Sequence, residues 1–446
     1  MDDFHQFVNK VQEYKKSNQF QKALDYFKNE KVNFSSEQIA SNRFLISNII
    51  ASLRKTNKSN FVNSFIETYK IVINENTDEI LLNAYGWALY DICKSEVSNN
   101  NYNKEKLLQR IQYPIQLISL KNSDFSYSII SNIFRLVLKV EKHKLNQDWN
   151  FINNFCNLFN PEILNLECGT SEIRGKTTEF ASDKENWYAT KSKALFELNY
   201  FQECYEISKL AISNIDSFHY NNDLWFARRI ALSKKALGNI NEAIEDLEVI
   251  YIKRKEWFIK KELADLYFET GDIKKAFEYA IDAICKNGFS KLEFKIGLIL
   301  LLAKILKIQN ELDLSIKHFL LVKTIRDENG WKLPQELLDE LNKVHDEPIS
   351  NELLKKELTK YWKSFEPKSN NSIKNNNLQN GQIKTILNDN EKGKNGFLTS
   401  NKVDYYFLLP KHIKFLDKIN INTKVKFNII KLEDGKERAK ILEVLE

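Results

Sequence analysis

The fold of most of the chain follows from the segment Ala264–Phe277, which reads ADLYFETGDIKKAF. The small residue Ala264 is followed three positions later by Tyr267, and the turn residue Gly271 precedes a second small residue, Ala276. Glycine accepts the left-handed backbone conformation that ends a helix, and small side chains let two helices approach closely. The segment therefore predicts a helix-turn-helix hairpin.

The same pattern recurs through residues 187–326. Its turn residues are Asn199, Gly238, Gly271 and Asn310, which lie 39, 33 and 39 residues apart. The small residues are Ser192, Ala231, Ala264 and Ala303 before the turns, and Cys204, Ala243, Ala276 and Ser315 after them. A weaker copy opens the chain at Asn18, Gln19 and Phe20, with Ala23 and Phe27 following. The repeats predict a series of stacked helical hairpins.

This pattern resembles the tetratricopeptide repeat (TPR), whose period is about 34 residues. The copy from Ala264 to Ala283 matches most packing positions of that motif, although Ala280 stands where an aromatic residue is usual. The resemblance implies a superhelix whose concave groove binds a protein partner. TPR proteins that capture chaperone tails need lysine and asparagine at set positions. Lys235, Lys260 and Lys261 are present without a recognisable asparagine pattern, so we do not expect that use.

The composition agrees with a mostly helical protein. Only 12 glycines and 6 prolines occur in 446 residues, so helix breakers are few. The five cysteines include no C-x-x-C pair, which favours a reducing compartment, and we expect a cytoplasmic protein. The N-terminus has no signal-peptide pattern. The most apolar run, Ile296–Ala303, is shorter than the roughly 20 residues that span a bilayer. We therefore expect a buried helix there and no membrane association.

Charge and composition divide the chain into five segments. Residues 367–446 contain 15 Lys and Arg against 9 Asp and Glu, which accounts for the whole net charge of +6. The predicted segments are an N-terminal helical region (1–160), an irregular connector (161–186), TPR-like repeats (187–365), an Asn-rich linker (366–380) and a small β domain (381–446). The predicted fold class is mostly α, a TPR-like solenoid with a C-terminal all-β barrel of the OB (oligonucleotide-binding) type. The local lysine surplus suits phosphate contacts, but charge alone favours a solvated lysine-rich surface.

The β domain shows alternating apolar residues in short segments with turn signals between them. The segments are 383–387, 405–409 and 425–430. Two further motifs are Lys392–Leu398, which reads KGKNGFL, and Asp404–Leu408, which reads DYYFL. They resemble the two motifs of the cold-shock domain, a five-stranded OB barrel whose outward aromatic residues stack on single-stranded bases.

Position by position, the resemblance places Phe397 and Tyr406 in the base-stacking platform. Strand alternation agrees, because Tyr406 and Leu408 share one face while Tyr405 and Phe407 face the core. The first motif has one extra residue. Asn395, Thr385 and Leu408 occupy positions where the family has an aromatic residue, a tryptophan and a histidine. Phosphate contacts are predicted for five lysines: Lys384, Lys392, Lys394, Lys411 and Lys414.

Other chemical motifs are weak. Residues Gly169–Thr177 resemble the sequence of a phosphate-binding loop. They differ from it because one extra residue separates the glycines and no apolar strand precedes them. The six histidines are isolated in sequence. No catalytic residue, metal ligand or cofactor site is predicted from the sequence. The aromatic segment Tyr85–Tyr90 has helical spacing and is expected to be core rather than a recognition surface.

These features predict a non-enzymatic adaptor. Its repeats would bind a protein partner, and its barrel would bind single-stranded nucleic acid, RNA or DNA, with RNA favoured. TPR hairpins followed by a cold-shock-like barrel also resemble accessory proteins of predicted bacterial conflict systems, including the TOTE type, which implies anti-phage defence beside an effector enzyme. The alternative is a protein-protein scaffold that binds no nucleic acid. A third reading, an enzyme assembled from dispersed residues, requires a deep polar pocket with perturbed ionisable groups.

Overall fold

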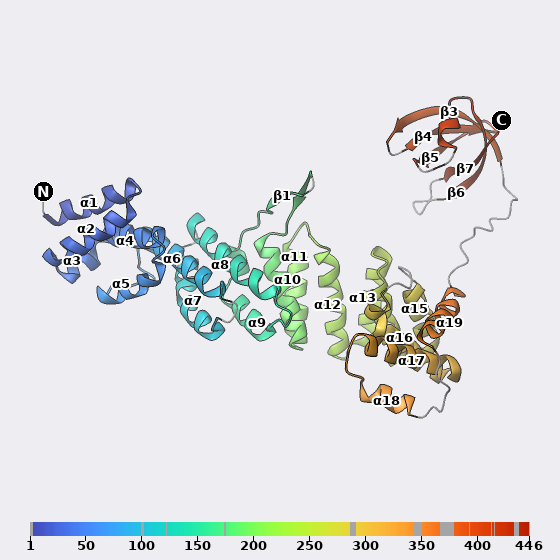
Figure 1. Ribbon diagram of the computed structural model, residues 1–446, viewed down its shortest axis with the longest axis horizontal. Helices are drawn as coiled ribbons and strands as arrows, with labels where there is room; N and C mark the ends of the chain where they lie inside the picture. Colours follow the sequence, from blue (N-terminus) through green and yellow to red (C-terminus); the bar gives the residue numbers. More distant parts are fainter. Residues whose placement is uncertain are drawn as a thin grey trace. The chain divides into compact units, whose positions relative to one another are not determined.

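A computed structural model gives the arrangement of the chain (Figure 1). It describes residues 3–99, 102–121, 123–173, 175–285, 291–342, 350–365, 379–391, 393–411, 413, 415–431 and 437–445. The chain divides into two compact units, residues 1–345 and 346–446. The first is helical apart from one short hairpin. The second holds one helix and a β-barrel.

The first helices form a small layer with its own core. They are α1 (Asp3–Lys16), α2 (Phe20–Glu30), α3 (Ser36–Ser41), α4 (Arg43–Lys55) and α5 (Val62–Thr68). Helix α4 packs against α1 and α2, and its apolar face, including Leu45 and Ile49, is buried. Asn18 adopts a left-handed conformation (φ 56°) between α1 and α2, and Ala23 is fully buried. The predicted opening hairpin is confirmed.

The next four helices are α6 (Glu79–Val97), α7 (Lys104–Ser119), α8 (Asp124–Lys142) and α9 (Trp149–Asn157). The first three of them meet at Gly86 on α6. A Cβ atom at Gly86 would lie 2.8 Å from Cδ1 of Ile129 on α8 and 2.9 Å from Cδ1 of Ile118 on α7. Tyr85 and Trp87 pack against the same apolar cluster. The aromatic segment around Gly86 is therefore part of the packing, as predicted.

The connector contains regular structure where an irregular segment was predicted. Strands β1 (Thr170–Ile173) and β2 (Lys176–Glu179) pair in antiparallel register and form a hairpin within the segment that resembled a phosphate-binding loop. Gly175 at its turn has φ 72°, which suits glycine. The hairpin precedes α10 rather than opening into a helix at its second glycine, so it has no phosphate-loop geometry.

Four TPR-like hairpins follow. They are α10 (Asp183–Glu197) with α11 (Phe201–Asn214), α12 (Asn222–Ala236) with α13 (Ile240–Lys253), α14 (Trp257–Glu269) with α15 (Ile273–Cys285), and α16 (Ile296–Ile308) with α17 (Leu312–Glu328). The predicted turn residues all have positive φ: Asn199 61°, Gly238 94°, Gly271 82° and Asn310 65°. All eight predicted small residues are buried. The repeat prediction is confirmed at each of these positions.

The hairpins stack through their neighbouring helices. Helix α11 packs on α12, α13 on α14, and α15 on α16. One apolar cluster runs from Leu82 on α6 to Phe226 on α12, so the repeats continue the packing of the preceding helices. Helix α18 (Gln335–Leu341) packs on α17. Within the part of the chain described, no helix combines the length and apolarity needed to cross a bilayer.

The second unit contains α19 (Asn351–Lys363) and a closed five-stranded barrel. Its strands are β3 (Gln379–Asn390), β4 (Gly393–Ser400), β5 (Val403–Pro410), β6 (Lys424–Lys431) and β7 (Glu437–Leu445). They close in the order β3-β4-β5-β7-β6, with only β5 and β7 parallel, which is the topology of an OB-type barrel. The predicted linker residues 366–378 lie outside the described residues.

The barrel core is formed by inward residues of every strand. Its fully buried members include Ile383, Leu398, Phe407, Val425 and Phe427. Strand β3 has two register shifts against β4, at Ile383/Thr385 and Ile386/Asn388, and bends there. The β4–β5 connection is a two-residue turn in which Asn401 and Lys402 both have positive φ, a geometry that matches the twist of a hairpin.

Gly396 should be indispensable to the barrel. A Cβ atom there would lie 1.9 Å from the backbone oxygen of Thr385, so Gly396→Ala must separate β3 from β4. We expect the substitution to destabilise the barrel by more than about 3 kcal/mol. Amide hydrogen exchange in β3–β5 measures the loss. Gly297→Ala on α16, where the added Cβ meets only Lys261 at 3.8 Å, is the control. Unchanged exchange in Gly396→Ala would contradict the described register.

His318 should make the helical unit sensitive to acid. Burial lowers its pKa to about 4, and its Nδ1–H donates to the Leu314 carbonyl over 2.7 Å. Below pH about 6.5 the unfolded chain binds a proton that the folded imidazole does not bind, so the free energy of unfolding falls as the pH drops towards 4. The loss approaches about 3 kcal/mol.

Urea unfolding of His318→Leu across this pH range measures the effect. The wild type should lose stability relative to the variant as the pH falls, because leucine does not titrate. His143→Gln, at an exposed position, is the control. A constant stability difference between the wild type and His318→Leu would show that His318 does not contribute.

Candidate functional site

The outer face of the barrel carries a row of residues on adjacent strands. Thr385 on β3 is paired with Phe397 on β4, Phe397 with Tyr406 on β5, and Tyr406 with Arg438 on β7. Directly paired residues point to the same side of a sheet, so these four side chains form one line across the barrel wall. We call them the outer row.

The two aromatic rings of the outer row lie against each other in an edge-to-face arrangement. Their centroids are 5.6 Å apart and their planes are inclined by 69°. Phe397 is exposed, with 37% of its surface accessible, and Tyr406 is half-buried. Phe407 is fully buried, and Tyr405 packs on the core with its ring 5.5 Å from that of Phe427. Phe397 therefore keeps accessible surface on the outside of the barrel.

Arg438 is a member of the outer row that the sequence analysis did not identify. It is half-buried, and its Nε atom is buried without a hydrogen-bond partner among the described residues. A guanidinium beside aromatic rings can stack on a base or bind a phosphate. Its position follows from the parallel pairing of β5 with β7, which no local pattern reveals.

The predicted lysines are not equivalent. The Lys384 ammonium lies 2.5 Å from a carboxylate oxygen of Asp404, and this hydrogen bond holds the pKa of the Asp404 carboxyl below its usual value. Lys394 is buried: its ammonium donates to the Ile419 carbonyl over 3.1 Å and lies 3.2 Å from a carboxylate oxygen of Asp389. Lys411 is exposed at the end of β5. Lys392 and Lys414 lie outside the described residues.

A second row lies beside the first and is less suited to stacking. Asn388 is paired with Asn395, and Asn395 with Leu408. The Asn388 amide donates to Oδ1 of Asn395 over 3.2 Å, and Leu408 is exposed. Asn395 and Leu408 are the two residues that the resemblance matches to an aromatic residue and a histidine of the cold-shock motifs. With stacking at about 1–3 kcal/mol per base, the barrel offers less stacking energy than a complete platform.

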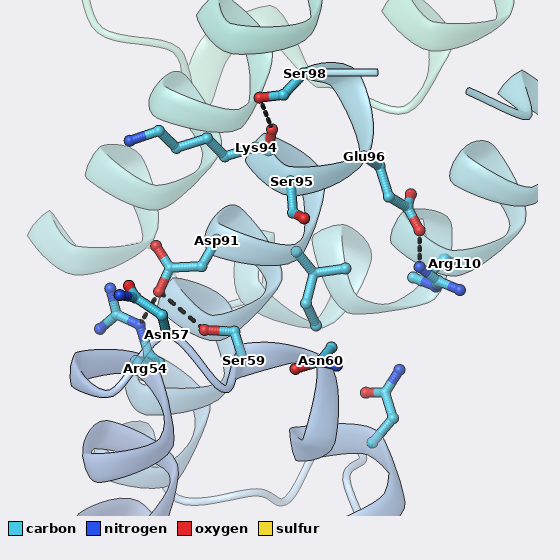
Figure 2. A pocket seen from close by; sticks show the side chains of 12 residues that line it. Arg54, Asn57, Ser59, Asn60, Asp91, Lys94, Ser95, Glu96, Ser98 and Arg110 are labelled. Carbon is cyan, nitrogen blue, oxygen red and sulfur yellow. Dashed lines mark hydrogen bonds and ion pairs between the residues drawn. The ribbon is translucent and has the colours of Figure 1, made fainter. Parts of the chain in front are cut away.

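The helical unit has a polar depression of about 690 Å³ between α4–α5 and α6–α7 (Figure 2). Asp91 accepts hydrogen bonds from Arg54 over 2.8 Å and from Ser59 over 3.3 Å. Arg110 and Glu96 form a second ion pair at the other side. The Arg54 guanidinium also lies over the Trp87 ring. The amide side chains of Asn57, Asn60 and Asn63 complete the lining.

Four of the five charged side chains in this depression form two ion pairs, and the fifth, Lys94, is exposed and in no described ion pair. Each arginine faces a carboxylate, and the lining contains neither histidine nor cysteine. The depression therefore has hydrogen-bonding groups for a polar chain, and its Ser59 hydroxyl donates to the Asp91 carboxylate.

No protein-family model matches the chain, and no curated protein matches its sequence. Among solved structures, a TPR protein from Parabacteroides merdae matches with a TM-score of 0.29 at 13% identity, over 76% of this chain and 97% of that protein. Human IFIT1 in a dimer with PPP-AAAA matches with a TM-score of 0.33 at 14% identity, over 75% and 72%. BtubC from P. vanneervenii matches with a TM-score of 0.30 at 12% identity, over 62% and 98%.

Lys394 should act as a structural residue of the barrel. Lys394→Met keeps the aliphatic chain but leaves the Ile419 carbonyl without its donor, which costs about 1–3 kcal/mol. We expect faster amide hydrogen exchange in the barrel strands of this variant. Lys411→Met, at an exposed position, should exchange like the wild type. Equal exchange in the two variants would show that the Lys394 ammonium does not stabilise the barrel.

Proposed function

We propose that the protein is a non-enzymatic adaptor whose barrel binds single-stranded nucleic acid, with RNA as the favoured ligand, and whose helical unit binds a protein partner. The outer row of the barrel carries the proposal. Phe397 and Tyr406 present aromatic surface on the second and third strands of an OB-type barrel, the face that oligonucleotides use in this fold. Bases of any identity have a face for stacking, so we expect little sequence preference.

The charges around the outer row support the same ligand. Arg438 extends the row, Lys440 is exposed on the same strand, and Lys411 is exposed directly after β5. Lys384 contributes less, because Asp404 balances its charge. Phosphate contacts by such side chains release counterions and make affinity fall with salt. Binding should therefore depend on both the rings and the ionic strength.

The polar depression of the helical unit is the proposed contact for an extended segment of the protein partner. Backbone amide and carbonyl groups of a peptide need donors and acceptors, and Asn57, Asn60 and Asn63 provide both. The two ion pairs balance four of the five charged side chains, which leaves one positive charge, that of Lys94. A role in anti-phage defence stays a prediction from domain order.

Fluorescence polarisation with a labelled single-stranded RNA of about 12 nucleotides tests the nucleic-acid half of the proposal. Phe397→Ala and Tyr406→Ala should each weaken binding roughly 5- to 150-fold, which corresponds to about 1–3 kcal/mol. Arg438→Gln and Lys411→Met should each reduce the slope of log affinity against log salt by about one. Leu442→Ala, at an exposed apolar position on β7, is the control and should bind like the wild type.

Two outcomes would reject nucleic-acid binding. One is the absence of a polarisation change at low salt, and the other is equal affinity for the ring variants, Leu442→Ala and the wild type. Either result would favour the alternative hypothesis of a protein-protein scaffold, in which the barrel contacts protein. The same measurement with a single-stranded DNA of the same sequence shows whether RNA or DNA binds more tightly.

A further inference from the structure

Three potential metal ligands come together at the base of the β1–β2 hairpin. Cys168 precedes β1, Glu179 ends β2, and His219 lies in the turn between α11 and α12. Their ligand atoms all lie within 4.8 Å of one another. The three residues are separated by up to 51 positions in the sequence, so each looks isolated there.

A buried carboxylate fixes the orientation of the histidine. Glu185, in the first turn of α10, is 1% exposed. Its Oε2 lies 2.7 Å from Nδ1 of His219, and its Oε1 accepts the His219 backbone N–H over 2.8 Å and the Asn222 amide over 2.7 Å. Nδ1 is thus occupied by Glu185, and Nε2 is directed towards Glu179. A carboxylate on the far ring nitrogen is the usual support of a metal-bound histidine.

The backbone of the turn is also held in an uncommon conformation. Tyr220 and Asn221, directly after His219, have φ values of 52° and 59°. A left-handed conformation is unfavourable for a bulky residue such as tyrosine. The bonds from His219 and Asn222 to Glu185 hold this turn against α10. The imidazole is therefore positioned by the fold before any ligand arrives.

The spacing of the ligand atoms suits a tetrahedral ion. Bonds of about 2.0–2.3 Å to nitrogen, oxygen and sulfur separate the atoms of a tetrahedral zinc site by roughly 3.3–3.8 Å. Nε2 of His219 and Oε2 of Glu179 are 3.6 Å apart. The Cys168 side chain is half-buried and the Glu179 side chain is exposed, and the three ligand atoms lie within 4.8 Å of one another, about 1 Å beyond the spacing of a tetrahedral site.

We propose that Cys168, Glu179 and His219 bind a divalent transition-metal ion of the zinc class, with Glu185 as the positioning residue and a fourth position left for water. A thiolate, an imidazole and a carboxylate together favour zinc over the hard ions magnesium and calcium. The ion would join the β1–β2 hairpin to the turn before α12 and, through Glu185, to α10. Its first effect would be to stabilise this part of the helical unit.

Cobalt(II) titration of the metal-free full-length protein tests the site, because cobalt replaces zinc and reports its ligands in the absorption spectrum. We expect one ion per chain, visible bands of tetrahedral cobalt and a near-ultraviolet band from the sulfur ligand. Cys168→Ser should lose the sulfur band. His219→Ala and Glu179→Gln should weaken binding, and Glu185→Gln should weaken it about 10- to 100-fold while keeping the sulfur band. Cys285→Ser, at another half-buried cysteine of the same unit, is the control.

Zinc titration followed by thermal unfolding gives an independent readout. Zinc should raise the unfolding midpoint of the wild type and of Cys285→Ser, but not that of His219→Ala, because a ligand that binds only the folded chain stabilises it. Circular dichroism establishes that each variant is folded. The proposal is overturned if the folded wild type takes up no ion, or if Cys168→Ser keeps the sulfur band.

Discussion

The close approach of two helices at a pair of small side chains is the constraint on which the helical unit depends. In the first hairpin, Cys204 on α11 lies against the backbone of α10 and its thiol donates to the Ser192 carbonyl over 3.3 Å. In the fourth, the Ser315 hydroxyl donates to the Ala303 carbonyl over 2.8 Å. Alanines occupy both positions in the two hairpins between them, and all are fully buried. A larger residue at either point would separate the helices and disturb the stacking on the next hairpin.

The repeats could be predicted because each hairpin is local. The turn residue and both small residues lie within 13 consecutive positions, from Ala264 to Ala276 in the best copy, so the pattern is visible without knowledge of distant contacts. Helices α6, α7 and α8, which precede the repeats, approach one another closely by a different means. Gly86 makes room for Ile118 and Ile129 on two other helices, and these partners cannot be inferred from the sequence around the glycine. The regular hairpin β1–β2 was missed for a related reason, because its strands are short and polar.

The barrel shows both the use of strand alternation and its limit. Alternation correctly places Phe407 inside the barrel and Leu408 outside. The same rule puts Lys394, three positions before Phe397, on the inner face, and its buried ammonium agrees. Lys394 was predicted to contact phosphate on the basis of its charge alone, without regard to strand alternation. Arg438 could not have been found in this way, because its place beside Tyr406 depends on the order in which the strands close.

The distribution of charge gives the two units different chemistry. Residues 1–366 have equal numbers of acidic and basic side chains, and the surplus of six positive charges lies in residues 367–446. In the polar depression of the helical unit each arginine faces a carboxylate and Lys94 is the one further charge, so binding there depends mainly on hydrogen bonds and shape. On the barrel, Arg438, Lys411 and Lys440 are found in no described ion pair. Counterion release therefore favours a polyanion at the barrel over one at the depression. This distribution of charge supports the proposal that the two units bind different ligands.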